Sequence, residues 1–182
     1  ILNSLSERPT RLYELVEMPP VVNGADDAAG PGMGGVIFPL RTPESIPYLW
    51  RARFPPDIVN DLVSHSNPHG TVNNSDLELA GTIIQQDGYA SLVDVRERTV
   101  HTCADNTPAV AWQGKGSVTT SSPPAYLLRL QALHQRYHRY HPTFHYIPGP
   151  VNAMADDCSR FCHLDDSHLL SFFNSNYPQT PP

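Results

Sequence analysis

The stretch Tyr146–Arg160 reads YIPGPVNAMADDCSR and predicts a strand, a sharp turn and a helix in immediate succession. The residues from Phe144 to Ile147 are typical of a short strand, and Pro148–Pro150 would end it. Asn152 is a good helix N-cap, and the helix that it starts would continue to the end of the stretch. Asp156 therefore lies in the first turns of a helix that closely follows a strand.

Working outward from this stretch, the rest of the chain predicts three early strands and then alternating helices and strands. The predicted strands are 21–27, 34–40, 48–54, 99–104 and 144–147. The predicted helices are 57–63, 75–87, 107–113, 124–140, 152–160 and 164–173. Ser75 is the expected N-cap of the second helix, because Glu78 follows at capping-box spacing. Together these elements predict an α/β fold, a mixed five-stranded sheet flanked by helices with a site at one edge.

Two of the predicted helices carry apolar residues at helical spacing. In the helix that starts at Ser75 these residues are Leu77, Leu79, Ile83 and Ile84. In the 124–140 helix they are Leu127, Leu128, Leu130 and Leu133, and we expect all four to pack inward.

Four acidic residues lie at the starts or ends of these elements, where they could converge: Asp27, Glu78, Asp105 and Asp156. Carboxylates that crowd together raise one another's pKa, and the cluster costs stability unless a cation lies between them. Oxygen ligands suit Mg²⁺ or Mn²⁺, and two such ions can hold both the attacking water and the leaving oxygen of a phosphodiester. An Asp at a strand end is more often a turn or cap residue, so none of the four alone indicates an enzyme.

The local sequences around these acids resemble the ribonuclease H domain of gypsy-like LTR retrotransposons. The opening stretch is similar to that family's closing signature, Y-I-P-G-x-x-N-x-x-A-D-x-L-S-R, with Cys158 in place of its apolar residue. Residues 104–112 resemble the S-D-N-x-A-A-V segment, 27–36 the opening hairpin, and 75–80 the helix with the catalytic Glu. The resemblance covers about residues 20–163, and the four motifs follow one another in the family's order.

The resemblance implies a metal-dependent endoribonuclease that cuts the RNA strand of an RNA–DNA hybrid during reverse transcription. It implies that Asp27, Glu78, Asp105 and Asp156 are the catalytic metal ligands of two Mg²⁺ ions, for which Mn²⁺ can substitute. Asp27 is preferred to Asp26 because it directly precedes Ala28-Ala29. Asp156 is preferred to Asp157 because it directly follows Ala155 in the A-D motif.

Basic residues in and after the 124–140 helix are candidates for binding the substrate. Arg129, Arg136 and Arg139 are spaced to lie on roughly one helical face, and the hybrid's phosphates are their expected partners. A solvated face of an amphipathic helix would explain the same spacing. Asn106, beside Asp105 in the third motif, is the fourth residue assigned to substrate binding.

Three cysteines, Cys103, Cys158 and Cys162, are too few and of the wrong number for a disulfide framework. They favour a reducing intracellular location, whether the cytoplasm, a virus-like particle or the nucleus. Cys158, Cys162 and His163, with Cys103 as a fourth ligand, suggest a zinc site. The spacing is not that of a zinc motif, however, and cysteines buried in the core are the preferred interpretation.

The 182 residues carry a formal net charge of −6 and include one lysine, which argues against a general nucleic-acid coat. There is no apolar run long enough to span a membrane. The absence of an initiator Met suggests a piece of a longer polypeptide. The predicted divisions are a tether from an upstream polymerase or connection region (1–20), the ribonuclease H-like domain (21–163) and a C-terminal short helix with a tail (164–182).

Two further functions fit the same residues. A non-catalytic ribonuclease H-like connection module would support a polymerase, but such modules lose the acids that this chain keeps. A domesticated host protein could use the fold for binding alone. The low basicity leads us to expect an attached reverse transcriptase domain of the same polyprotein as a partner, besides the RNA–DNA hybrid.

Overall fold

The computed structural model describes residues 16, 18–30, 32–40, 46–119 and 123–178. Its strands are β1 (Pro20–Ala29), β2 (Gly32–Pro39), β3 (Tyr48–Arg53), β4 (Thr99–Ala104) and β5 (His141–Tyr146). Its helices are α2 (Pro56–Asn60), α3 (Asn74–Leu92), α4 (Thr107–Lys115), α5 (Pro123–His138), α6 (Ala153–Arg160) and α7 (Asp166–Asn176), with a short 3-10 helix, η2 (Gly149–Val151). Residues 1–15 and 17 of the predicted tether lie outside the described residues.

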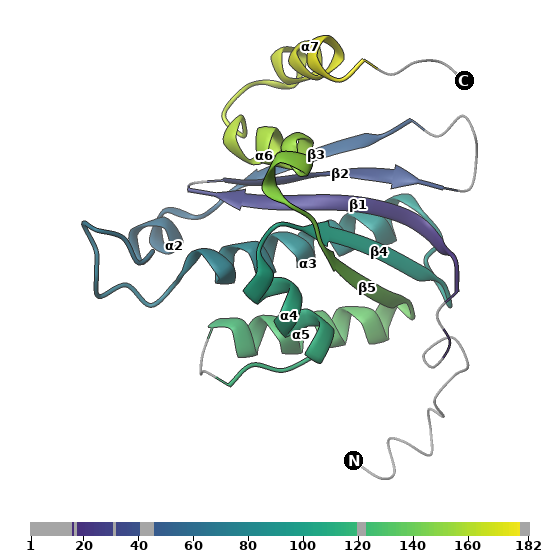
Figure 1. The fold of residues 1–182 in the computed structure, drawn as a ribbon, viewed down its shortest axis with the longest axis horizontal. Coiled ribbons are helices and arrows are strands. Elements are labelled where there is room, and N and C mark those ends of the chain that lie inside the picture. The colour runs from purple at the N-terminus through teal and green to yellow at the C-terminus, as the bar shows by residue number, and fades with distance from the viewer. Residues whose placement is uncertain (1–15, 17, 31, 41–45, 120–122, 179–182) are drawn as a thin grey trace.

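The five strands form one sheet in the order β3-β2-β1-β4-β5 (Figure 1). The first three strands pair antiparallel, whereas β4 pairs parallel with both β1 and β5. The mixed five-stranded sheet predicted from the sequence is therefore confirmed. The last β1–β4 pair joins Ala25 to Cys103, and β1 continues beyond it to Ala29. Asp26 and Asp27 thus lie where β1 extends past its parallel neighbour.

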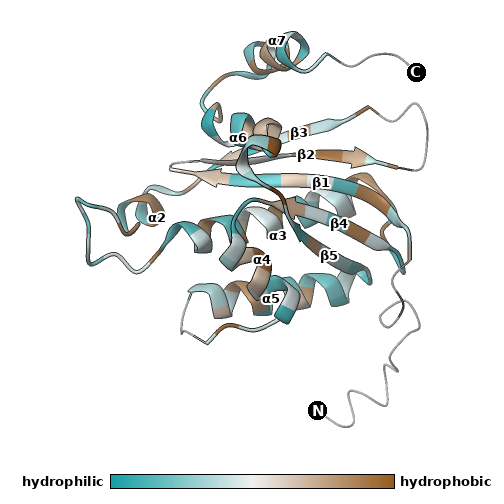
Figure 2. Cartoon of the chain, viewed as in Figure 1, coloured by the Kyte–Doolittle hydropathy of each residue, from teal (hydrophilic) through white to brown (hydrophobic). Residues whose placement is uncertain are grey.

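Helices cover both faces of the sheet, with α6 and α7 on one side and α3, α4 and α5 on the other (Figure 1). Successive β2 residues point to opposite faces, so Val36 packs with Cys158, Leu169 and Phe173, and Ile37 joins the cluster around Tyr89. The outer helices α5 and α7 carry both hydrophilic and hydrophobic stretches, as helices with one solvated side do (Figure 2).

Helix α6 lies directly on β2 because a glycine there leaves room for its backbone. A Cβ added at Gly34 would lie 2.6 Å from the carbonyl carbon of Cys158, too close for any side chain. The predicted glycine-rich hairpin therefore has a packing role, and it sets the distance between the sheet and the helix that carries Asp156.

The predicted cap of α3 is wrong by two residues. Asn73 is the N-cap: its side chain accepts from the backbone N–H of Asp76, and the Asp76 side chain accepts from the N–H of Asn73. This reciprocal pair is a capping box in which Asp takes the usual place of Glu. Glu78 is thereby free of any capping role.

The predicted inward placement of three apolar side chains is also wrong, and one predicted N-cap lacks its side-chain hydrogen bond. In α5 only Leu128 of the four leucines is buried, and Leu130 and Leu133 are 42% and 64% exposed, because α5 packs on α3 along one side only. In α3, Ile84 is likewise exposed. Asn152 precedes α6 but makes no side-chain cap; its amide donates instead to the backbone carbonyl of Asp26 at 3.0 Å.

Candidate metal-binding carboxylate site

Two adjacent acids on β1 have separate surroundings, since consecutive strand residues point to opposite faces. Asp26 is fully buried, and its Oδ2 accepts from the hydroxyl of Thr82 on α3 at 2.8 Å. Asp27 is 5% exposed and accepts from the hydroxyl of Ser159 on α6. The two neighbouring acids are therefore held by helices from opposite layers.

Glu78 reaches this region from the second turn of α3. It is buried, and Asn74 donates to its Oε1 at 3.3 Å. Its second oxygen, Oε2, is buried and has no hydrogen-bond partner. A buried acceptor left in that state costs free energy unless a cation or a proton satisfies it.

Asp105 follows directly after β4, one residue before the Asn106 N-cap of α4. A Cβ added at Gly149 would lie 3.0 Å from Asp105 Oδ2. The glycine of the opening stretch therefore allows the loop before η2 to pass close to this carboxylate.

The structure brings Asp27, Glu78 and Asp105 together: one carboxylate oxygen from each lies within 4.8 Å of the others. Asp156 is not a member of this group. Both of its carboxylate oxygens accept from Nε of Arg160, at 2.7 and 2.6 Å, one turn further along α6. It is nevertheless near enough to raise the pKa of Asp27.

The crowding of carboxylates raises the pKa of several members. Burial, and then the charges of Asp27, Asp26 and Asp105, raise the pKa of Glu78 from 4.5 to about 9. Burial is also the largest cause of the raised pKa of Asp27 and of Asp26. Without a cation, Glu78 would therefore hold a proton near neutral pH, and a bound cation would displace it.

These residues fit a hard divalent cation. The donor set is all oxygen, it carries up to three negative charges, and Glu78 Oε2 offers an acceptor that no protein group satisfies. Asp27, Glu78 and Asp105 would hold such an ion.

The predicted substrate-binding residues are dispersed. Arg129 and Arg136 are exposed on α5, whereas Arg139 lies one residue beyond the helix, with a φ of 61°, and pairs with Glu97. The three arginines therefore do not share one helical face. Asn106 uses its side-chain oxygen to accept from the N–H of Ala109 at 3.0 Å, as the cap of α4.

The cysteines do not gather into a metal site among the described residues. All three are free thiols, and Cys158 is completely buried in the cluster between α6 and the sheet, where burial raises its pKa to about 12.

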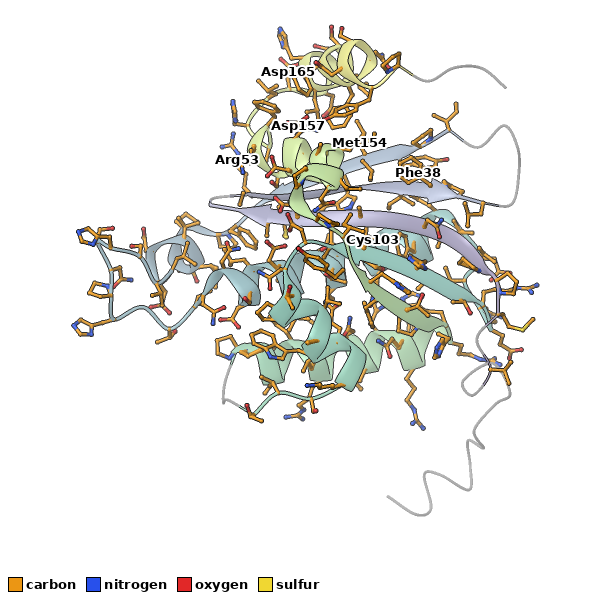
Figure 3. All side chains as sticks on the ribbon, in the orientation of Figure 1. Phe38, Arg53, Cys103, Met154, Asp157 and Asp165 are labelled. Atoms are coloured by element: carbon orange, nitrogen blue, oxygen red, sulfur yellow. The ribbon has the colours of Figure 1, made fainter. Side chains whose placement is uncertain are left out.

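Met154 and Asp157, labelled in Figure 3, lie on the same helix as Cys158, and Asp157 accepts from the hydroxyl of Tyr177 just after α7, at 2.5 Å.

Sequence reasoning missed the residues that position the acids. Thr82, Ser159 and Asn152 each contact one of the two aspartates of β1, by hydrogen bonds to side chain or backbone. Ser159 and Arg160 stand in the closing motif itself, and the spacing of Asp156 and Arg160 at i and i+4 was a signal for their ion pair.

No protein-family model matches this sequence, and no curated protein matches it significantly. Solved structures do resemble it. A ribonuclease H1 of the archaeon Halobacterium salinarum NRC-1 aligns with a TM-score of 0.53 and 15% identity over 76% of this chain and 94% of its own. A ribonuclease H1 from a compost metagenome, LC11-RNase H1, aligns with a TM-score of 0.55 and 16% identity over 77% of this chain and 91% of its own.

A viral protease–reverse transcriptase has a similar fold in one part of its length. The prototype foamy virus protease–reverse transcriptase aligns with a TM-score of 0.50 and 14% identity, over 84% of this chain and 22% of its own. None of the helices in the described part of the chain is long and apolar enough to cross a membrane. The sheet order, the flanking helices and these likenesses establish that the chain has a ribonuclease H-like fold.

Proposed function

We propose that this chain hydrolyses the RNA strand of RNA–DNA hybrids in a metal-dependent reaction. The observation that carries the proposal is the group formed by Asp27, Glu78 and Asp105, three carboxylates from three separate elements within 4.8 Å. The fold supports it as well, since a structure of LC11-RNase H1 in complex with an RNA/DNA hybrid aligns with a TM-score of 0.50 and 17% identity, over 77% of this chain and 94% of its own.

Each of the proposed residues has a defined task in the reaction. Asp27, Glu78 and Asp105 would hold divalent ions, Mg²⁺ or Mn²⁺, and we propose two of them with Asp156 as the fourth ligand. When bound, such ions activate a water and stabilise the charge that develops on the phosphate. Ser159 orients the Asp27 carboxylate, and Asn74 orients that of Glu78. Arg160 holds Asp156 beside the cluster and supplies a positive charge there.

We also propose the contacts to the substrate and the cellular setting. Arg129 and Arg136 are exposed and suited to contact phosphates, and Asn106 stands next to Asp105. The likeness to part of the foamy virus protease–reverse transcriptase supports an origin in a reverse-transcribing element with a polymerase domain as partner. We also propose an intracellular site of action and the division into a tether (1–20), the domain (21–163) and a C-terminal segment (164–182).

The decisive experiment is cleavage of a hybrid whose two strands carry different labels, in Mg²⁺, Mn²⁺ or EDTA. We expect cutting of the RNA strand alone, with no cutting in EDTA, and loss of that activity in Asp105→Asn. Asp57→Asn is the matched control, because Asp57 is an exposed acid on α2. Hybrid binding without cutting, in both the isolated chain and a fusion to its polymerase, would instead favour a non-catalytic module.

A further inference from the structure

A second group of ligand atoms lies where the last part of α3 faces the end of α5. It consists of Asp87, His134 and His138, each of which places one ligand atom within 4.8 Å of the other two. His134 and His138 are four residues apart on α5 and therefore lie on one face of that helix. Their rings are close, with centroids 4.3 Å apart. None of these residues belongs to the carboxylate site.

The hydrogen bonds of His134 determine which of its ring nitrogens carries a proton. The Tyr140 hydroxyl donates its one hydrogen to Gln86 Oε1 at 2.8 Å. With the Gln86 amide in this orientation, Nδ1 of His134, 2.9 Å from the same hydroxyl, is the donor in that contact. In the neutral ring with the proton on Nδ1, Nε2 carries no hydrogen, and its lone pair can bind a metal ion.

The Nε2 lone pair faces a second acceptor. Asp87 Oδ1 lies 3.3 Å from it. Two acceptors at this distance repel each other unless a proton or a cation lies between them. The His134 side chain is only 14% exposed, whereas that of Asp87 is 63% exposed.

We propose that Asp87, His134 and His138 bind one divalent transition-metal ion of the Zn²⁺ type. Bonds of 2.0–2.1 Å in a tetrahedral site separate neighbouring ligand atoms by about 3.3 Å, and Asp87 Oδ1 and His134 Nε2 are 3.3 Å apart. Imidazole nitrogens select such an ion over Mg²⁺. The Nδ1–H of His134 donates to an oxygen, as the second nitrogen of a metal-bound histidine usually does. Three protein ligands leave the fourth position to water or to an external ligand.

The position of the site gives it a structural consequence. The ion would connect α3, which carries Glu78, to α5, which exposes Arg129 and Arg136. It would therefore fix α5 relative to the carboxylate site without taking part in hydrolysis, and the proposal stands whether or not the chain cleaves RNA.

The test is a Zn²⁺ titration of the whole chain against a chromogenic zinc indicator, with excess Mg²⁺ present to compete for the oxygen-only cluster. We expect one zinc per chain, with affinity reduced more than about 100-fold in His138→Gln and in Asp87→Asn. Tyr140→Phe removes the partner of Nδ1 and is expected to reduce affinity by about 10- to 100-fold. His65→Gln is the matched control, because His65 is an exposed histidine in the loop before α3.

A measurement on the unmodified chain avoids the problem of a variant that fails to fold. In ¹⁵N spectra of the unmodified chain, one equivalent of Zn²⁺ should shift a ring nitrogen of both His134 and His138 and leave His65 unchanged. Equal zinc affinity in His138→Gln, Asp87→Asn and His65→Gln would overturn the proposal. So would the absence of any shift at His134 and His138.

Discussion

Helix α3 presents two groups of ligand atoms of different chemistry, Glu78 near its start and Asp87 nine residues later. At a rise of about 1.5 Å per residue they are roughly 13 Å apart along the helix. At the first, every ligand atom is an oxygen and the carboxylates raise one another's pKa. At the second, two histidines face one acid. One helix can thus carry two groups of possible ligand atoms of different chemistry, because different elements pack against its two parts.

The largest expected effect is on the cleavage rate, and it follows from a change at the carboxylate site. Glu78→Gln keeps the shape of the side chain and removes its charge. A bound metal ion stabilises the charge of the transition state by several kcal/mol, so we expect cleavage of the hybrid to fall at least about a thousandfold in this variant. The measurement is the single-turnover rate in Mg²⁺, with Asp57→Asn as control. A loss below about tenfold would remove Glu78 from the proposed site.

The second expected effect is a dependence of stability on pH in the metal-free chain. The pKa of Glu78 is 4.5 in the unfolded chain and about 9 in the folded one. Between these values the folded state binds a proton that the unfolded state has released, so the free energy of unfolding falls as pH rises. We expect a loss of roughly a few kcal/mol from about pH 5 to about pH 9.

Urea denaturation in EDTA at several pH values measures this loss, to which Asp26 and Asp27 add with the same sign. Glu78→Gln should flatten the dependence, and so should Mg²⁺. An identical pH dependence in the variant would show that Glu78 titrates normally in the folded chain.

A smaller effect on the free energy of unfolding distinguishes Asp26 from Asp27. Asp26 is fully buried and its pKa is raised mainly by that burial, so its ionised form destabilises the fold. Asn at this position can still accept from Thr82, and we expect Asp26→Asn to raise the free energy of unfolding at about pH 8 by about 1 kcal/mol. The gain should shrink as the pH falls toward about 4, the ordinary pKa of Asp, because the acid is then protonated in the unfolded chain too. A destabilised variant at both pH values would mean that the Asp26 charge is satisfied in the fold.

The smallest effect concerns α5, the helix that supplies the two histidines. If Arg136 contacts a phosphate, Arg136→Gln should reduce the slope of log affinity against log salt by about 1. Fluorescence anisotropy in an Asp105→Asn background measures binding without cleavage, and Arg96→Gln, a change at another exposed arginine, is the control. An unchanged slope would leave Arg136 as a solvated residue.

The sheet and the three clustered acids could be predicted because their signals are local. Asp105 directly follows a predicted strand, and Asp27 stands in the first of the four motifs. Both features can be recognised without knowledge of distant contacts. The cap of α3 was mispredicted because both Asn73 and Ser75 have an acid three residues later. The capping-box spacing alone cannot choose between them. In the fold, Asn73 is the cap and the Glu78 side chain lies with the carboxylates of Asp27 and Asp105.

The remaining differences depend on tertiary contacts. Leu130 and Leu133 suit a buried face, but α5 packs on its neighbours through Leu128, and they stay exposed. The ion pair of Asp156 with Arg160 follows from spacing on one helix and could have been anticipated. The group around His134 could not, because it forms only when residues 47 positions apart, Asp87 and His134, are brought together by helix packing.

The parallel pairing of β1 with β4 also has a consequence for the order of folding. Strands β1, β2 and β3 are close in sequence and can form their antiparallel pairs early, whereas Asn23 pairs with His101 across a long crossover. Closing that long loop costs more chain entropy, and such non-local pairings form slowly. Asp27 is already on the early hairpin, but Asp105 joins it only when the crossover closes. A refolding chain would therefore acquire the proposed divalent-ion site in this slow step, which would make metal binding a reporter of the completed fold.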